Sequence, residues 1–222
     1  MKFSIITIFP EVFNFYLNTS ILRRAREKKL VDFDIYNLRD FSSDKKHSNI
    51  DDSPYGGGAG MVLMAGPILK AVDNIISKKT KKLRTKVIIL SAKGKQFNQK
   101  IAYDFSKKFD RFILISGRYE GIDERVKKIL KASEVSIGPY VLTDGDVASM
   151  AIISAISRLV PGVIKFESLK EESHDDILEY PHYTRPEIIK YKNKKYIVPK
   201  VLLSGDHKKI EDWRRKNKKP NL

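Results

Sequence analysis

The sequence contains no cysteine and only four histidines. Disulfides, thiolate zinc sites and cysteine nucleophiles are therefore excluded, and any catalysis must use carboxylates, histidine, hydroxyls, arginine or a bound cofactor. His47 and His207 are too isolated to indicate a zinc site. No apolar run approaches the roughly 20 residues that a membrane helix needs, and the start, MKFSIITIFPEVF, lacks the features of a signal peptide. We expect a cytoplasmic protein without a membrane partner.

Negative charge is also in short supply, because the 27 acidic residues face 43 lysines and arginines, which leaves a net charge of +16. Such an excess favours binding to a polyanion, since each neutralised phosphate releases condensed counterions. A lysine-rich proteome encoded by an AT-rich genome would produce the same charge without any RNA partner. The basic residues concentrate in two places, Arg23, Arg24, Arg26, Lys28 and Lys29, and Arg214, Arg215, Lys216, Lys218 and Lys219.

Short β-branched runs alternate with segments of helical periodicity along the first three quarters of the chain. The predicted strands are Phe3–Ile8, Phe33–Asn37, Lys86–Leu90, Arg111–Ile115 and Glu134–Ile137. The predicted helices are Pro10–Leu17, Pro67–Ile76, Asn98–Phe105, Asp123–Leu130 and Asp146–Leu159. This alternation predicts an α/β fold with a mostly parallel sheet covered on both faces, and a ligand site beyond the carboxyl ends of its strands.

The character of the sequence changes after Val160-Pro161-Gly162, where charges thicken and apolar periodicity fades. We expect a first domain over 1–164, a linker over 165–171 and a small, mainly helical domain over 172–222. Arg185–Lys190 and Asp206–Lys216 are its predicted helices, the latter capped by Asp206. So small a domain cannot bury much core by itself.

Glycines cluster in segments that could bind a ligand. The long polar stretch Leu38–Ala65 contains the run 54–60, PYGGGAG, whose backbone could approach an anion or could be a flexible loop. Three further segments follow predicted strands, at 90–94, 117–125 and 136–146. Each could be a simple turn, but together they could line one crevice suited to an adenine edge and ribose hydroxyls.

An ordered series of motifs now becomes recognisable: FPE at 9–11, RDF at 39–41, DDSPYGGGAGM at 51–61, SGRYEGIDERV at 116–126, SIGPYVLTDGD at 136–146, SRLVPGV at 157–163, YPHYTRPE at 180–187 and VLLSGDH at 201–207. Over 1–213 the chain closely resembles bacterial tRNA (guanine-N1-)-methyltransferases, the TrmD family of the SPOUT superfamily. The resemblance implies a SPOUT-type domain with a C-terminal trefoil knot, a helical C-terminal domain that binds tRNA, and a homodimer with its active site at the subunit interface.

The resemblance also implies the cofactor, S-adenosylmethionine, and the position of the methylated guanine, residue 37 of tRNA, just 3′ of the anticodon. The implied cofactor residues are Leu90, Ser91, Ala92, Gly117, Arg118, Tyr119, Glu120, Ser136, Ile137, Gly138, Pro139, Tyr140, Val141, Leu142 and Gly145. Magnesium assistance is a further implication, with Glu120 as the candidate ligand. Three departures from the family pattern stand in the last loop, where Pro139, Asp144 and Asp146 replace an aspartate, a glycine and a different acid.

For catalysis the resemblance implies a carboxylate base contributed by the opposite subunit, which matches Glu172 here in place of an aspartate. Glu171 and Asp175 compete for this role, because the segment is one residue shorter than usual. Arg158 matches an arginine that assists the reaction, although a helix-end arginine could also bind carbonyl groups. The implied tRNA-binding residues are Asp51, Tyr55, Gly57, His182 and Arg185. The alternatives are an inactive RNA-binding homologue and a knotted methyltransferase acting on ribose or ribosomal RNA.

Overall fold

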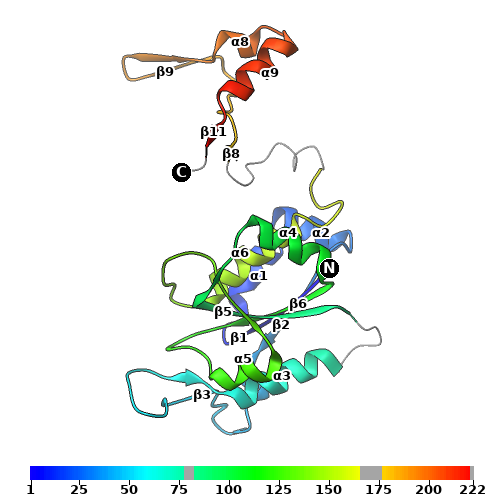
Figure 1. Ribbon diagram of the computed structural model, residues 1–222, viewed down its shortest axis with the longest axis vertical. Helices are drawn as coiled ribbons and strands as arrows, with labels where there is room; N and C mark the ends of the chain where they lie inside the picture. The colour runs from blue at the N-terminus through cyan, green and yellow to red at the C-terminus, as the bar shows by residue number, and fades with distance from the viewer. Residues whose placement is uncertain (78–82, 166–176, 221–222) are drawn as a thin grey trace. The chain divides into compact units, whose positions relative to one another are not determined.

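The computed structural model describes residues 1–77, 83–165 and 177–220, and the chain forms two compact units, Met1–Lys165 and Phe166–Leu222 (Figure 1). The first unit contains a five-stranded sheet of order β2-β1-β6-β5-β7, in which every neighbouring pair is parallel. Its strands are β1 Lys2–Thr7, β2 Asp32–Asn37, β5 Thr85–Gln96, β6 Arg111–Ser116 and β7 Ser133–Ser136. The predicted parallel α/β sheet is therefore confirmed.

Helices cover both faces of this sheet (Figure 1). On one face lie α1 Glu11–Leu17, α2 Ser20–Glu27, α4 Gln99–Lys108 and α6 Gly145–Ser157. On the other lie α3 Ala65–Ser77 and α5 Glu124–Leu130. Each face has its own apolar core: Phe3, Phe112 and Ile152 belong to the first, and Ile6, Ile68 and Ile113 to the second. Helix α2 escaped prediction because its arginine-rich sequence has only two buried residues, Leu22 and Ala25.

Strand β5 is longer than predicted and pairs with β7 over two stretches. Leu90 and Lys95 are both register partners of Val135, with an irregularity in the pairing between them. A Cβ on Gly94 would contact the backbone nitrogen of Val135. Glycine at this position permits the backbones of β5 and β7 to approach each other closely.

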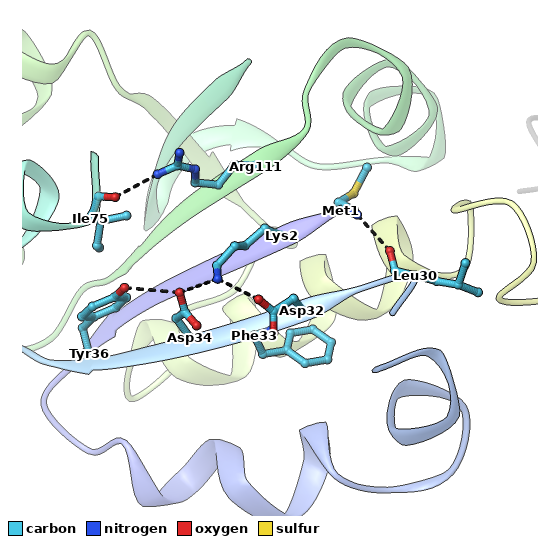
Figure 2. Close-up of polar contacts among 9 residues, drawn as sticks. All are labelled: Met1, Lys2, Leu30, Asp32, Phe33, Asp34, Tyr36, Ile75 and Arg111. Atoms are coloured by element: carbon cyan, nitrogen blue, oxygen red, sulfur yellow. Dashed lines mark hydrogen bonds and ion pairs between the residues drawn. The ribbon is translucent and has the colours of Figure 1, made fainter. Parts of the chain in front are cut away.

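The amino-terminal ends of β1 and β2 are joined by a polar network (Figure 2). The Lys2 ammonium lies 2.7 Å from an oxygen of Asp32 and 2.8 Å from one of Asp34. Burial disfavours the charged ammonium, but the hydrogen bonds and charges of the two carboxylates outweigh the effect of burial and raise the pKa of Lys2. On the neighbouring β6, buried Arg111 donates to the carbonyl of Ile75 at the end of α3. These contacts lie at the amino-terminal ends of the strands, whereas the ligand site is expected at their carboxyl ends.

The second unit contains β8 Ile177–Leu178, β9 Ile188–Tyr191, β10 Lys194–Ile197, α8 Lys200–Leu203, α9 His207–Lys216 and β11 Lys219–Pro220. The prediction of α9 is confirmed, and Asp206 caps it by accepting from Lys209 N at 3.1 Å.

The predicted helix Arg185–Lys190 is wrong, because β9 and β10 form a hairpin there. Pro186 disfavours a helix at this point, and Ile188, Ile189 and Tyr191 have high strand propensity. Among the described residues this unit is therefore a mixture of strands and helices rather than mainly helical. In neither unit is a described helix long and apolar enough to cross a membrane.

Candidate active site

A cavity of about 390 Å³ lies at the carboxyl ends of β6 and β7 and beside residues 89–93 of β5. Most of its wall comes from the three segments that follow predicted strands. All the predicted cofactor residues line it except Gly138 and Pro139. These lining residues are Leu90, Ser91, Ala92, Gly117, Arg118, Tyr119, Glu120, Ser136, Ile137, Tyr140, Val141, Leu142 and Gly145. The structure thus brings segments more than 40 residues apart into one concave surface.

Close backbone contacts hold the loops together at the start of α6. Gly145 N donates to the carbonyl of Gly117 at 2.8 Å. A Cβ on Gly145 would lie 2.7 Å from Gly117 N and 2.9 Å from Ser116 Cα, so only glycine allows this approach. One turn later, the hydroxyls of Ser116 and Ser149 are 3.0 Å apart in the interior. The first turn of α6 is therefore wedged against the end of β6.

Gly138 shapes the cavity although it does not line it. The ring of Tyr140 folds back over this glycine, and a Cβ on Gly138 would lie 2.6 Å from Tyr140 Cζ and 2.9 Å from its hydroxyl oxygen. The Tyr140 hydroxyl donates to the carbonyl of Ile137 at 3.4 Å. Gly138 therefore sets the position of an aromatic side chain in the cavity wall.

One wall of the cavity carries a charge cluster that the sequence reasoning missed. Lys127 Nζ is 2.7 Å from Glu134 Oε2, and Lys93 Nζ is within 3.7 Å of both Glu134 and Glu124. Burial disfavours ionisation of Glu134, but hydrogen bonds from Lys127 and Ser91 and the charges of Lys93 and Lys127 lower its pKa. The spacing of Glu124 and Lys127, three residues apart on a helix, was the available signal; the pairing with Glu134 depends on the fold.

A second acid that was not predicted as a site residue, Asp146, is buried just below the cavity, with 2% of its surface exposed. Burial raises the pKa of Asp146, and the hydroxyls of Thr7 and Ser116 offset part of this effect. Its Oδ1 has no hydrogen-bond partner within the described part of the chain. A perturbed, buried carboxyl group beside a cavity is typical of functional sites.

The glycine-rich run lies between the short strands β3 Asp51–Asp52 and β4 Val62–Leu63, which pair with each other. This hairpin is fastened to the middle loop of the cavity, because Glu120 N donates to Met61 O at 3.1 Å and Leu63 N to Gly121 O at 3.0 Å. Asp51 is the register partner of Leu63 in this hairpin, and Tyr55 and Gly57 lie in the run between its strands, with Tyr55 fully exposed. Glu120 packs against Gly60, where a Cβ would lie 2.6 Å from Glu120 Oε1.

Three of the predicted site residues lie elsewhere. Arg158 is at the C-terminal end of α6, the opposite end from Gly145, and is not among the cavity residues. His182 and Arg185 belong to the second unit, where His182 Nε2 is 2.9 Å from Glu179 Oε2. Nearby, Tyr180 and Tyr183 each contact the ring of Trp213 in α9. Glu172, with its competitors Glu171 and Asp175, lies outside the described residues.

Within ranges 1–77, 83–165 and 177–220, no group of three or more histidine or acidic side chains is arranged to hold a metal ion. Glu120 therefore has no such cluster around it in that part of the chain. Lysine and arginine neighbours balance several of the cavity's carboxylates instead.

Comparison with known proteins identifies the family of this chain. The family described as tRNA (Guanine-1)-methyltransferase TrmD matches residues 1–221. A tRNA (guanine-N(1)-)-methyltransferase of Thermomicrobium roseum is 50% identical over 216 residues, covering 97% of this chain and 78% of the relative. Enzymes of that name from Carboxydothermus hydrogenoformans and Clostridioides difficile are each 50% identical over 218 residues, 97% of this chain and 82% and 91% of the relatives. The chain is therefore a member of the bacterial tRNA (guanine-N1)-methyltransferase family, a transferase that modifies tRNA.

Proposed function

We propose that this enzyme transfers the methyl group of S-adenosylmethionine to N1 of guanine 37, the nucleotide 3′ of the anticodon of tRNA. The observation that carries the proposal is the cavity itself: in a member of the guanine-N1 family, three strand-end loops enclose about 390 Å³. That volume is in the range of small-molecule sites. The exposed backbone groups of these loops suit an adenine edge and a ribose, and the paired charges on one wall suit an amino acid moiety.

The chemistry makes two demands on the chain. N1 of guanine carries a proton, which must leave as the nitrogen forms its bond to the methyl carbon and the carbon–sulfur bond breaks. A carboxylate can accept that proton, and a cation can stabilise the negative charge that develops on O6. S-adenosylmethionine, when bound, supplies an electrophilic methyl group on a sulfonium. We assign proton removal to Glu172 and charge stabilisation to Arg158, on the family resemblance.

A trefoil knot in the first unit would account for the path of β5. The irregular pairing of β5 with β7, the close approach of Gly94 to Val135 and the wedging of Gly145 against Gly117 support this proposal. A knot would also explain why the cofactor loops are tied to one another rather than standing as separate turns. Threaded chains are otherwise rare in proteins.

A homodimer would reconcile the position of Arg158 with its proposed role. Helix α6 has 13 residues and starts at the cavity, so its far end is about 20 Å away. An arginine there would assist at a cavity contributed by a second copy. Helices α1 and α6 contact each other and expose Val12, Phe15 and Val147, with Phe15 83% exposed. Such apolar side chains favour burial against another protein surface.

The tRNA contacts are assigned to the hairpin beside the cavity and to the second unit. Asp51, Tyr55 and Gly57 would meet the target nucleotide, and His182 and Arg185 the anticodon stem-loop. Aromatic and arginine planes suit the stacking of unpaired bases, and the basic α9 suits phosphates.

The proposal is tested with purified protein, labelled S-adenosylmethionine and an unmodified tRNA carrying guanine at position 37. We expect 1-methylguanosine at that position after nuclease digestion and mass analysis, and no product from the same tRNA with adenine 37. Absence of methyl transfer would indicate an inactive RNA-binding homologue. A methyl group on a ribose hydroxyl, or transfer only to ribosomal RNA, would contradict the assignment of N1.

The Gly138→Ala variant tests the cofactor assignment separately. The added methyl group must displace the ring of Tyr140, so we expect the KM for S-adenosylmethionine to rise about tenfold, as an affinity loss of about 1.4 kcal/mol implies. The melting temperature should change little, because Tyr140 is half exposed. Gly66→Ala is the matched control, since a Cβ there meets nothing within 4 Å. Equal KM values for the two variants would argue against cofactor binding in this cavity.

A further inference from the structure

Asp144 and Arg118 form an ion pair across the rim of the cavity. Arg118 NH2 lies 3.2 Å from Asp144 Oδ2, and both residues line the cavity from different loops. The side chain of Arg118 is 29% exposed and that of Asp144 is 13% exposed, so the pair is partly shielded from water. Such a pair is more strongly coupled than one on the open surface.

Asp144 is held rigidly because its two oxygens have separate tasks. Oδ1 caps α6 by accepting from Asp146 N at 2.9 Å and Val147 N at 3.4 Å. Oδ2 binds Arg118 and also accepts from the Thr143 hydroxyl at 3.1 Å. The helix cap therefore fixes the carboxylate in the orientation that faces Arg118.

The other side of the Arg118 guanidinium rests on an aromatic ring. Its Cζ lies 4.4 Å from the centroid of Phe9, whose backbone nitrogen donates to Thr7 Oγ1 at 3.1 Å. The Nε of Arg118 is buried without a hydrogen-bond partner in the described ranges. A buried unsatisfied donor costs free energy, and the contacts with Asp144 and Phe9 offset that cost.

We propose that Asp144 is a positioning residue that holds Arg118 against Phe9, so that the guanidinium is preorganised for an oxygen acceptor of the ligand in the cavity. This inference rests on the proposed function. The oxygen belongs either to the carboxylate of S-adenosylmethionine or to the tRNA guanine, because arginine binds both kinds of acceptor. Preorganisation raises affinity by removing the entropy cost of ordering a long side chain on binding.

The test combines Asp144→Asn with Arg118→Gln in a double-mutant cycle, using calorimetric titration of S-adenosylmethionine and, separately, of unmodified tRNA. Asparagine keeps the capping oxygen but loses the charge, so the melting temperature should stay near that of the wild type. We expect Asp144→Asn to lower the affinity for one of the two ligands on the order of tenfold. In the Arg118→Gln background the same change should have almost no effect. The ligand whose affinity falls in Asp144→Asn is the one that supplies the oxygen acceptor.

Asp110→Asn is the control, because it breaks another aspartate–arginine pair of the first unit, with Arg84, that does not line the cavity. Unchanged binding of both ligands by Asp144→Asn would overturn the inference, as would a loss that persists in full without Arg118. Both titrations measure binding, so they decide the role of Asp144 even if the wild type transfers no methyl group. The absence of methyl transfer by the wild type would count against the proposed function alone.

Discussion

Replacing Glu172 by glutamine is expected to slow methyl transfer by about 10²–10⁴-fold, the usual contribution of a general base, while S-adenosylmethionine binds as tightly as before. Glutamine is close in size but cannot accept the N1 proton. Single-turnover rates with tRNA saturating, together with calorimetry for the cofactor, would separate the two effects.

Three carboxylates that line the cavity are poor candidates for this role, namely Asp123, Glu134 and Asp144. Hydrogen bonds from Arg125 lower the pKa of Asp123 against the opposing effect of burial, and Glu134 is likewise kept ionised by Lys127 and Ser91. A carboxylate with a lowered pKa is a weaker base. Asp144 is engaged by Arg118 and by the cap of α6. These pairings leave room for a base supplied from outside the cavity.

Glu171→Gln and Asp175→Asn are the matched controls for Glu172→Gln, because they remove neighbouring charges from the same segment. Both should retain rates near that of the wild type. A normal rate for Glu172→Gln with a loss in either control would move the role of base to that neighbour. A loss in Glu120→Gln alone would place the base within the cavity.

Gly145→Ala should damage both the fold and the ligand site. The new methyl carbon would lie 2.7 Å from Gly117 N, 2.9 Å from Ser116 Cα and 3.0 Å from Leu90 Cβ. Two of these neighbours are backbone atoms, so no side-chain rotation relieves the clash, and overpacking of this kind costs about 1–3 kcal/mol. Relief requires α6 to move away from both the 90–94 and the 117–121 loops.

We therefore expect a lower melting temperature for Gly145→Ala together with at least a tenfold loss of S-adenosylmethionine affinity, which is about 1.4 kcal/mol. Thermal unfolding and calorimetry on the same preparation would measure the two quantities. Gly66→Ala in α3 should match the wild type in both. If Gly145→Ala also does so, the close contact between α6 and the strand-end loops is not needed for binding.

Several elements could be predicted from local sequence alone. The runs that form β1 and β6 are short, apolar and rich in isoleucine, and several helices have recognisable caps, such as Asp123 before α5 and Asp206 before α9. The predicted helix Arg185–Lys190 is wrong, because the strand propensity of Ile188 and Ile189 favours the hairpin of β9 and β10. Strand β5 was predicted too short because Ser91 to Gly94 resembles a turn, and pairing with β7 continues the strand beyond it.

The sequence also predicted some parts of the cavity and not others. The strand-end rule and the family motifs identified most of its lining, but the charge partners of Glu134 and the pair between Asp144 and Arg118 were not foreseen. Glu134 meets Lys93 and Lys127 only after β5, α5 and β7 have packed together. No spacing in the chain encodes those distances.

The sequence by itself determined the alternation of strands and helices, the membership of a family and the segments that carry chemistry, because periodicity, caps and motifs are properties of neighbouring residues. Only the tertiary structure decided the sheet order, the irregular pairing of β5 with β7 and the place of Asp144 beside Arg118. Those features depend on contacts between residues far apart in the chain, which form only when the two apolar cores pack around one sheet.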